Sequence, residues 1–344
     1  MAEWYKGGKG IRTLVLGGTR FVGLRLVRRL VDLGHDITIL NRGRTQAQLP
    51  DGIKRLYADR RDANAMREAL LGKPFDVVFD MTGYQVVNLQ PLVPLFKGKA
   101  RHFVFCSTAA VYAPSETAPV REDYPYGPRM ATGPAAYGAE KVQCEEFLLQ
   151  TYREQGFPVT IIRPTLVYGP ENWMDEREGS YFTRLLQGRK ILVPGNGASL
   201  IHMGHVDDVA DDFIAVVGKQ NTFGQAYNAT GPEAITINGY IDLIASIVGV
   251  KAHKVYLEPS VMKTLKKPIF PFNWQRSTVV SIQKAKDHLG FWPKYDIQSG
   301  MKHTYEWWQK HHGVERMEFV PGRLGFDVDF TYEDELIKRY GEGQ

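Results

Sequence analysis

The chain has 344 residues, of which 43% are hydrophobic and 24% charged, a composition typical of a globular protein with a sizeable core. Its net charge of +5 permits binding to anions, but the clusters of Lys and Arg lie far apart in sequence and no regularly spaced aromatics accompany them, so no nucleic-acid partner is expected. Two cysteines argue against a disulfide framework. Without a signal peptide or a membrane-spanning apolar run, we expect a cytoplasmic protein with no membrane partner.

The N-terminal half alternates between short apolar strands and amphipathic helices. Strands are predicted at residues 11–18, 36–40, 75–81, 101–108 and 159–164, and helices at 21–34, 61–72 and 137–156. This alternation predicts an α/β fold, a Rossmann-like doubly wound parallel sheet with helices on both faces. Ligands bind such sheets at the carboxyl ends of the strands. We expect these residues to gather there: Gly17, Met81, Thr82, Gly83, Thr108 and Arg163.

The turn between the first strand and the first helix reads "GGTRFVG". Glycine lets backbone N–H groups approach a phosphate, and the helix N-terminus adds the positive end of its dipole. A tight connection without a ligand is the alternative, but a strand, turn, helix and second strand within about 30 residues is the context of a dinucleotide fingerprint. We expect a pyrophosphate here, with the cofactor contacted by Gly17, Thr19, Arg20, Phe21, Val22 and Gly23; Arg20 could add to the grip on a ribose 2′-phosphate.

This turn resembles that of the NAD-dependent epimerase/dehydratase family, the extended short-chain dehydrogenases/reductases. In that family the turn usually reads Gly-x-x-Gly-x-x-Gly; Gly17 and Gly23 match, whereas Arg20 replaces the middle glycine. With "NRGRT" after the second strand, the chain is similar to an atypical branch that includes the chloroplast stem-loop-binding proteins. The resemblance extends over residues 11 to about 310 and implies an NAD(P) cofactor and a homodimer.

The end of the second strand bears on the choice of cofactor. An acidic residue there would bind the ribose 2′-hydroxyl of NAD, but Asn41 stands in its place beside Arg42 and Arg44. Because arginine can bind a 2′-phosphate through two hydrogen bonds, we favour NADP(H) over NAD(H). The alternative is that these arginines are solvated loop residues and that Asn41 simply hydrogen-bonds the ribose. The family resemblance also implies an adenine contact at Asp59 and Arg60.

Four motifs in family order indicate the reaction centre. Tyr137 and Lys141 are spaced i, i+4 and share one face of the predicted helix. Thr108 stands four residues before Tyr112, where the family carries its catalytic Ser or Thr. The strand "IIRPTLVYGP" matches the family segment that lies near the nicotinamide, which implies contacts from Arg163 and Pro164.

The predicted chemistry follows from these residue types. A free tyrosine ionises near pH 10, and a nearby cation such as Lys141 favours its phenolate. Tyr137 could then take a proton from a substrate hydroxyl while Thr108 binds the same oxygen. Tyr137 and Lys141 also face the cofactor in this scheme, and Ser107 is expected beside it. Ala109 follows Thr108 where dehydrating and decarboxylating relatives carry acids, which argues against those reactions.

The rest of the chain is less regular. We expect a dinucleotide-binding domain over residues 11–170 with a returning strand near 225–230, a lobe that is mainly substrate-binding over 171–320, and a C-terminal extension over 321–344. In the extension, "YEDELIKRY" is typical of a short amphipathic helix docked on the body or on a second subunit.

Two residues in this half are candidate substrate contacts. Arg276 is the nearest match to a family arginine that often holds a nucleotide diphosphate. The basic residue that several nucleotide-sugar enzymes carry just before His205 is absent; Ile201 and His202 stand in that stretch, which argues against a UDP-sugar without excluding it. His202 and His205 lie near aspartates, but Asp207 fits a helix cap and no further ligands gather, so we expect no metal.

Three functions remain open. The leading one is an NAD(P)-dependent epimerase of a sugar, a sugar nucleotide or a related polyol, with a sugar-like substrate that could carry phosphate. The second is an NADP(H)-dependent ketone or sugar reductase. The third, from another class, is an RNA-binding protein on the same fold. An intact set of Thr108, Tyr137 and Lys141 favours an enzyme.

Overall fold

The computed structural model describes residues 10–172, 177–270, 278–311 and 328–341, which divide between two compact units. The first unit comprises Met1–Val167, Val206–Thr230 and Val280–Pro293. The second comprises Tyr168–His205, Gly231–Val279 and Lys294–Gln344. The chain therefore returns twice to the first unit after leaving it.

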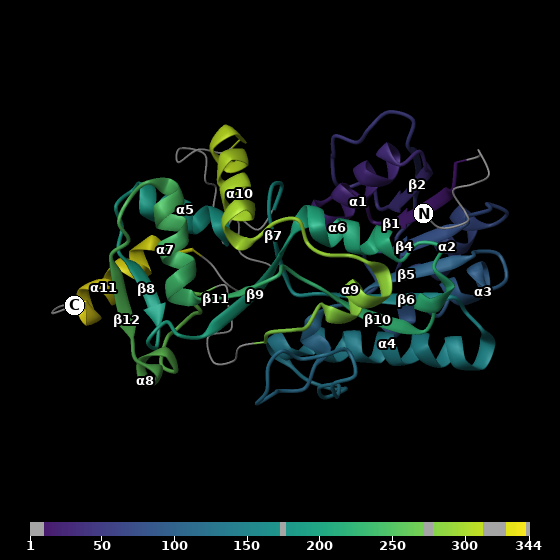
Figure 1. The fold of residues 1–344 in the computed structure, drawn as a ribbon. Coiled ribbons are helices and arrows are strands. Elements are labelled where there is room, and N and C mark those ends of the chain that lie inside the picture. Colours follow the sequence, from purple (N-terminus) through teal and green to yellow (C-terminus); the bar gives the residue numbers. More distant parts are fainter. Residues whose placement is uncertain (1–9, 173–176, 271–277, 312–327, 342–344) are drawn as a thin grey trace. The chain divides into compact units, whose positions relative to one another are not determined.

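A seven-stranded sheet forms the centre of the first unit (Figure 1). Every neighbouring pair of strands runs parallel, which confirms the predicted Rossmann-like fold. In spatial order the strands are β10 (Gln225–Ala229), β6 (Val159–Pro164), β5 (His102–Cys106), β4 (Val77–Asp80), β1 (Arg12–Leu16), β2 (Asp36–Asn41) and β3 (Lys54–Tyr57).

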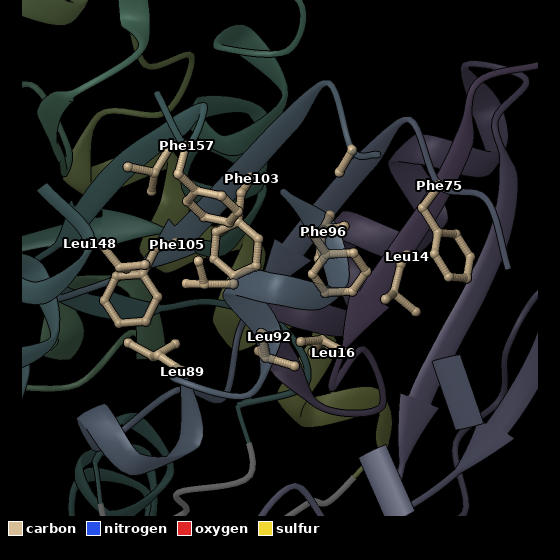
Figure 2. Packing of buried hydrophobic residues seen from close by; sticks show 14 of the residues in the cluster. Leu14, Leu16, Phe75, Leu89, Leu92, Phe96, Phe103, Phe105, Leu148 and Phe157 are labelled. Atoms are coloured by element: carbon tan, nitrogen blue, oxygen red, sulfur yellow. The ribbon is translucent and has the colours of Figure 1, made fainter. Parts of the chain in front are cut away.

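Helices cover both faces of this sheet. One face packs against α2 (Ala63–Leu70), α3 (Leu92–Phe96) and α4 (Ala136–Gln155) through a buried cluster that includes Leu14 and Leu16, and Figure 2 shows part of it. The other face packs against α1 (Phe21–Asp32), α6 (Val206–Ala215) and α9 (Gln283–Leu289) through a cluster that includes Val15. Successive residues of β1 thus point to opposite faces, so both faces of the strand are apolar.

Short 3₁₀ helices lie in several of the connections between the strands and helices of the first unit. η2 (Val86–Asn88) follows β4, and η3 (Ala109–Val111) follows β5. η4 (Gly133–Ala135) leads into α4, and η5 (Gln220–Thr222) precedes β10. The loops after β4 and β5 and the start of α4 bring the predicted catalytic residues to one edge of the sheet.

The second unit has shorter elements. They are β8 (Ile191–Pro194), β9 (Leu200–His205), β11 (Ala234–Thr236), β12 (Lys254–Leu257), α5 (Glu178–Leu186), α7 (Ile237–Val248), α8 (Pro259–Met262), α10 (Ile297–His311) and α11 (Phe330–Tyr340). The boundary between the two units falls within β7 (Leu166–Tyr168), where the chain first leaves the first unit. β11 pairs antiparallel with β9, and β12 pairs parallel with β8. None of the described helices combines the length and apolar character needed to cross a bilayer.

The helix expected near the C-terminus is α11, and it packs within the second unit. Leu336 lies in a buried cluster with residues of β8 and β12. Glu333 forms a buried ion pair with Arg184 of α5. Residues 330–340 therefore contribute to the core of the second unit.

Candidate active site

The turn after β1 has the geometry that an anion requires. Gly17 and Gly18 adopt φ values of 112° and 81°, which side chains disfavour. A Cβ on Gly23 would lie 3.1 Å from the backbone nitrogen of Gly18, so the start of α1 approaches the turn closely. No side chain caps the N-terminus of α1 and no acidic residue lies in its first turn. Because its amides have no side-chain cap, this helix end can receive a phosphate.

The remaining residues of this turn differ in exposure. Phe21, at a φ of 40°, and Gly23 are buried, so they can meet a ligand only through their backbone. Thr19 and Val22 are half-buried, and Arg20 is exposed. The amide of Gly17 itself donates to the carbonyl oxygen of Leu40 at 2.9 Å, and the pyrophosphate contact of this turn stays a prediction.

A polar group without a partner lies at the end of β2. The Oδ1 atom of Asn41 accepts a hydrogen bond from the amide of Gly43 at 2.7 Å, whereas its buried Nδ2 has no hydrogen-bond partner among the described residues. Arg42 and Arg44 are exposed beside it. A ligand oxygen would satisfy the Asn41 amide, so this edge fits the ribose end of a dinucleotide.

The neighbouring strand brings a second charged segment, residues 59–62, to the same edge. Asn41 pairs with Tyr57 of β3, whose ring is 61% exposed. Beyond it, Asp59 accepts from Arg61 at 2.7 Å, and this hydrogen bond holds the pKa of Asp59 well below its usual range, with a smaller contribution from Arg42. "NRGR" and "DRRD" are thus neighbours in space although they are distant in sequence.

Arg60 does not have the exposed position expected of an adenine contact. Its side chain is only 15% exposed, and its two terminal nitrogens donate to the two carboxylate oxygens of Asp80 at 2.7 and 2.9 Å. Burial alone would raise the pKa of Asp80, but Arg60 holds that pKa below its ordinary value. The expectation for Arg60 is corrected because a fully buried carboxylate at the end of β4 needs a counter-charge.

The predicted catalytic residues lie on loops and a helix end that meet. Thr108 caps η3, and its Oγ1 accepts from the amide of Ala110 at 3.2 Å. A Cβ on Gly138 would lie 2.5 Å from the carbonyl oxygen of Ala110, so only glycine allows the first turn of α4 to approach η3 this closely. This contact brings the helix turn that carries Tyr137 to the segment that carries Thr108.

Tyr137 and Lys141 differ sharply in exposure. Tyr137 is 41% exposed, whereas Lys141 is 2% exposed. The Nζ atom of Lys141 donates to the carbonyl oxygens of Gly83 at 2.7 Å and Cys106 at 2.6 Å, and lies 5.9 Å from the centre of the Tyr137 ring. The structure therefore holds a buried cation close to an accessible phenol.

One residue of this site was missed from the sequence. Glu145 lies a further helical turn beyond Lys141 and is fully buried. It accepts hydrogen bonds from Ser107, from Tyr126 at 2.7 Å, and from the Nε and Nη2 atoms of Arg163 at 2.6 to 3.1 Å. The i, i+4, i+8 spacing of Tyr137, Lys141 and Glu145 was the signal that could have identified it.

This network includes two residues that were expected beside the cofactor. Arg163, expected near the nicotinamide, is 2% exposed and also donates to Tyr112 at 2.9 Å. Ser107 is likewise 2% exposed and donates to Glu145. Both side chains are engaged inside the protein because the buried Glu145 carboxylate needs donors, and their contacts with a cofactor stay predictions.

Other predicted residues have simpler surroundings. Met81 donates its amide to Leu16 at 3.1 Å, and Pro164 ends β6 beside Ala229 of β10. In the second unit, the Nε2 of His202 lies 3.0 Å from the carbonyl oxygen of Gly231, and burial lowers the His202 pKa. Arg276 lies outside the described residues.

Comparison with known proteins identifies the family. Residues 13–91 and 92–230 match the "NAD dependent epimerase/dehydratase family". The chain is 30% identical over 342 residues to the chloroplast stem-loop binding protein of 41 kDa b from Arabidopsis thaliana, covering 95% of this chain and 84% of that protein.

Two solved structures share the fold. One is UDP-glucose 4-epimerase with UDP-glucose from Thermotoga maritima, at a TM-score of 0.73 and 22% identity, covering 87% of this chain and 99% of that one. The other is dTDP-glucose 4,6-dehydratase with NAD from Bacillus anthracis. Its TM-score is 0.74 and its identity 19%, and the match covers 88% of this chain and 97% of that one.

Proposed function

This chain belongs to the NAD-dependent epimerase/dehydratase family, and from that premise we propose that it is an NAD(P)-dependent epimerase of a sugar, a sugar nucleotide or a related polyol. The observation that carries the proposal is the Lys141 ammonium group, buried on two carbonyl oxygens within 5.9 Å of the centre of the Tyr137 ring. Bound NAD(P)⁺ would supply a hydride acceptor that can return the hydride to the opposite face of the same carbon.

The residues of this chain carry the proton chemistry. Lys141 favours the phenolate of Tyr137, which accepts the proton of a substrate hydroxyl and later returns it. The Thr108 hydroxyl binds the same substrate oxygen and keeps it in line. Sequence similarity to proteins such as the UDP-glucuronate 4-epimerase of Thermodesulfobacterium geofontis supports a sugar nucleotide as the substrate class.

The segment after Thr108 favours a reaction confined to oxidation and reduction. Ala109 is buried and Ala110 is exposed, and neither can exchange a proton. Dehydration and decarboxylation of sugars need a second acid or base, which this segment does not supply. An epimerase and a simple reductase both remain compatible with it, and the reductase is the alternative within the same class.

The cofactor retained by the protein distinguishes these two activities. The protein is purified without added nucleotide and denatured, and the released small molecules are identified by mass spectrometry. A stoichiometric dinucleotide supports an epimerase, which regenerates its cofactor in each cycle. An empty site that binds NADPH from solution supports the reductase, and failure to bind any dinucleotide would refute both.

We also propose that NADP(H) is preferred over NAD(H). The unpartnered Nδ2 of Asn41 and the exposed Arg42 and Arg44 offer donors to a 2′-phosphate. Arg42→Ala should therefore weaken NADPH binding about tenfold or more, with much less effect on NADH, in a fluorescence titration. The control is Arg153→Ala, an exposed arginine at the far end of α4. Equal losses for the two nucleotides would contradict the preference.

A second candidate function is RNA binding. The relative from Arabidopsis is named a stem-loop binding protein, and the pairing of β2 with β3 brings the exposed Tyr57 to the sheet edge that carries the exposed Arg42 and Arg44. Salt-sensitive binding of an RNA stem-loop that survives Tyr137→Phe and falls with Arg42→Ala would support it. Loss of turnover on sugar nucleotides in Tyr137→Phe, with normal turnover in Tyr124→Phe, would support the enzyme.

Two properties of the assembled protein complete the proposal. We expect a homodimer, as the family resemblance implies, and sedimentation equilibrium measures it directly. We expect a cytoplasmic location, although the Arabidopsis relative is named as chloroplastic. Fractionation of cells that express the full chain tests this expectation.

A further inference from the structure

A buried ion pair lies at the carboxyl end of β4, and the proposed chemistry does not use it. Asp80 is fully buried, and the Arg60 side chain that pairs with it is 15% exposed. Arg60 comes from the loop after β3, so the pair joins strands that are not neighbours in the sheet. Removing two charges from water is costly, and such a pair calls for a reason other than stability.

The pair fixes the turn that follows β4. Asp80 accepts a hydrogen bond from the amide of Thr82 at 3.0 Å, and Arg60 donates to the Thr82 hydroxyl at 2.7 Å. That hydroxyl in turn donates to the carbonyl oxygen of Leu16 at 3.3 Å, directly before the Gly17 turn. A Cβ on Gly17 would lie 3.0 Å from the methyl group of Thr82, so the two turns are in close contact.

The same turn holds the catalytic lysine. The carbonyl oxygen of Gly83 is one of the two acceptors of the Lys141 ammonium group, at 2.7 Å. A Cβ on Gly83 would lie 2.8 Å from Oδ2 of Asp80 and 2.8 Å from the ring of Phe105, so glycine alone fits between them. Asp80 therefore accepts a hydrogen bond from Thr82 and also packs closely against Gly83.

We propose that Asp80 and Arg60 are a positioning pair: they fix residues 81–83 so that Gly83 holds Lys141 beside Tyr137 and Thr82 supports the Gly17 turn. The role rests on the proposed function, since it matters only if Tyr137 and Lys141 perform the chemistry. Asp80 and Arg60 act through Lys141 and the two turns and touch neither substrate nor cofactor in this assignment.

The test follows the ionisation of Tyr137 in Asp80→Asn, which keeps the shape of the side chain and removes its charge. The ultraviolet absorbance of tyrosinate is titrated in each protein and in its Tyr137→Phe counterpart, and the difference isolates Tyr137 from the other tyrosines. The groups near Lys141 that also titrate are Tyr84, Cys106, Cys144 and Asp80 itself, and the subtraction removes Tyr84.

The direction of the shift separates the possible roles. If Asp80 positions Lys141, its loss moves the cation away, and Tyr137 ionises at a pH higher by about one unit or more. If Asp80 acts only through its own negative charge, its loss favours the phenolate, and Tyr137 ionises at a lower pH. No shift, or a shift downward, would overturn the proposal.

Two further variants complete the design. Asp76→Asn is the matched control, because Asp76 pairs with Arg12 at the opposite ends of the same strands β1 and β4, and it should leave the Tyr137 titration unchanged. Thr82→Val replaces Asp80→Asn if the latter does not fold, because it removes only the hydroxyl contacts of the turn. It should move the Tyr137 titration upward as well, and an unchanged titration would overturn the proposal.

The titration uses the protein without cofactor or substrate, so its result is independent of the proposed function. If the wild-type protein binds no dinucleotide, the epimerase proposal is refuted, but the titration still shows whether Asp80 positions Lys141. Normal dinucleotide binding combined with an unshifted titration would refute the positioning pair alone.

Discussion

Replacing Glu145 by glutamine should lower the free energy of unfolding far more than the same replacement at the neighbouring Glu146. The substitution preserves the size of the side chain and removes its charge. Arg163, which is 2% exposed, then keeps its own charge in the interior without a counter-ion. Burial acts to lower the pKa of Arg163, and the Glu145 carboxylate outweighs it and raises that pKa. Because arginine is not deprotonated in proteins, the guanidinium stays charged when this partner is lost.

The magnitude follows from the burial of the pair. The two side chains are 3% and 0% exposed, so solvent screens their interaction little. Removing one partner of a buried ion pair costs about 3–5 kcal/mol. Ser107 and Tyr126 also lose a charged acceptor, but these contacts share one cluster and their energies do not add. We therefore expect a loss of about 3–5 kcal/mol in the free energy of unfolding.

Urea unfolding followed by circular dichroism measures this loss. The control is Glu146→Gln, on the same helix, where the partner Arg129 is 71% exposed and little change is expected. A loss below about 1 kcal/mol in Glu145→Gln, or equal losses in the two variants, would refute the reasoning that this pair is desolvated.

Three further outcomes are expected. Burial lowers the pKa of His102 to about 3, whereas an unfolded histidine ionises near 6.5. The free energy of unfolding should therefore fall as the pH drops below about 6.5, by up to about 1.4 kcal/mol per pH unit. His102→Gln should flatten this decline, measured as the urea midpoint at each pH, and an unchanged slope would exclude His102 as its source. Gly138→Ala should displace η3 from α4, because its Cβ would lie 2.5 Å from the Ala110 carbonyl oxygen, and so reduce turnover at least tenfold while NADPH binding persists; unchanged turnover would contradict this packing. Leu336→Ala should lower the free energy of unfolding by about 2–5 kcal/mol in calorimetry or urea, and a neutral result would show that α11 does not close the core of the second unit.

The parallel sheet could be predicted from the sequence because each buried strand is a short apolar run between helical patterns. The predicted helix over 137–156 is α4, at Ala136–Gln155. The predicted strand over 159–164 is β6, with the same bounds. Period and length are local properties of the chain, and local patterns suffice for elements of this kind.

Side-chain partners across the sheet could not be predicted in the same way. Arg60 and Asp80 are 20 residues apart, and their pairing depends on how β1, β3 and β4 lie in the sheet. Arg163 and Glu145 are 18 residues apart and come from different elements. Family motifs assigned both arginines to the cofactor, because a motif identifies a position in the fold but not the direction of a side chain.

The division of the first unit into three chain segments has a consequence for its synthesis on the ribosome. Domains commonly fold as they emerge, N-terminal part first. Here the seventh strand, β10, is made only after the chain has passed through Tyr168–His205 of the second unit. Until then β6 has an open edge, and Tyr112 lacks Asn228, its partner 116 residues later. We expect a ribosome-bound chain shorter than about 225 residues to stay sensitive to protease, so that the catalytic half becomes compact only when most of the protein has been translated.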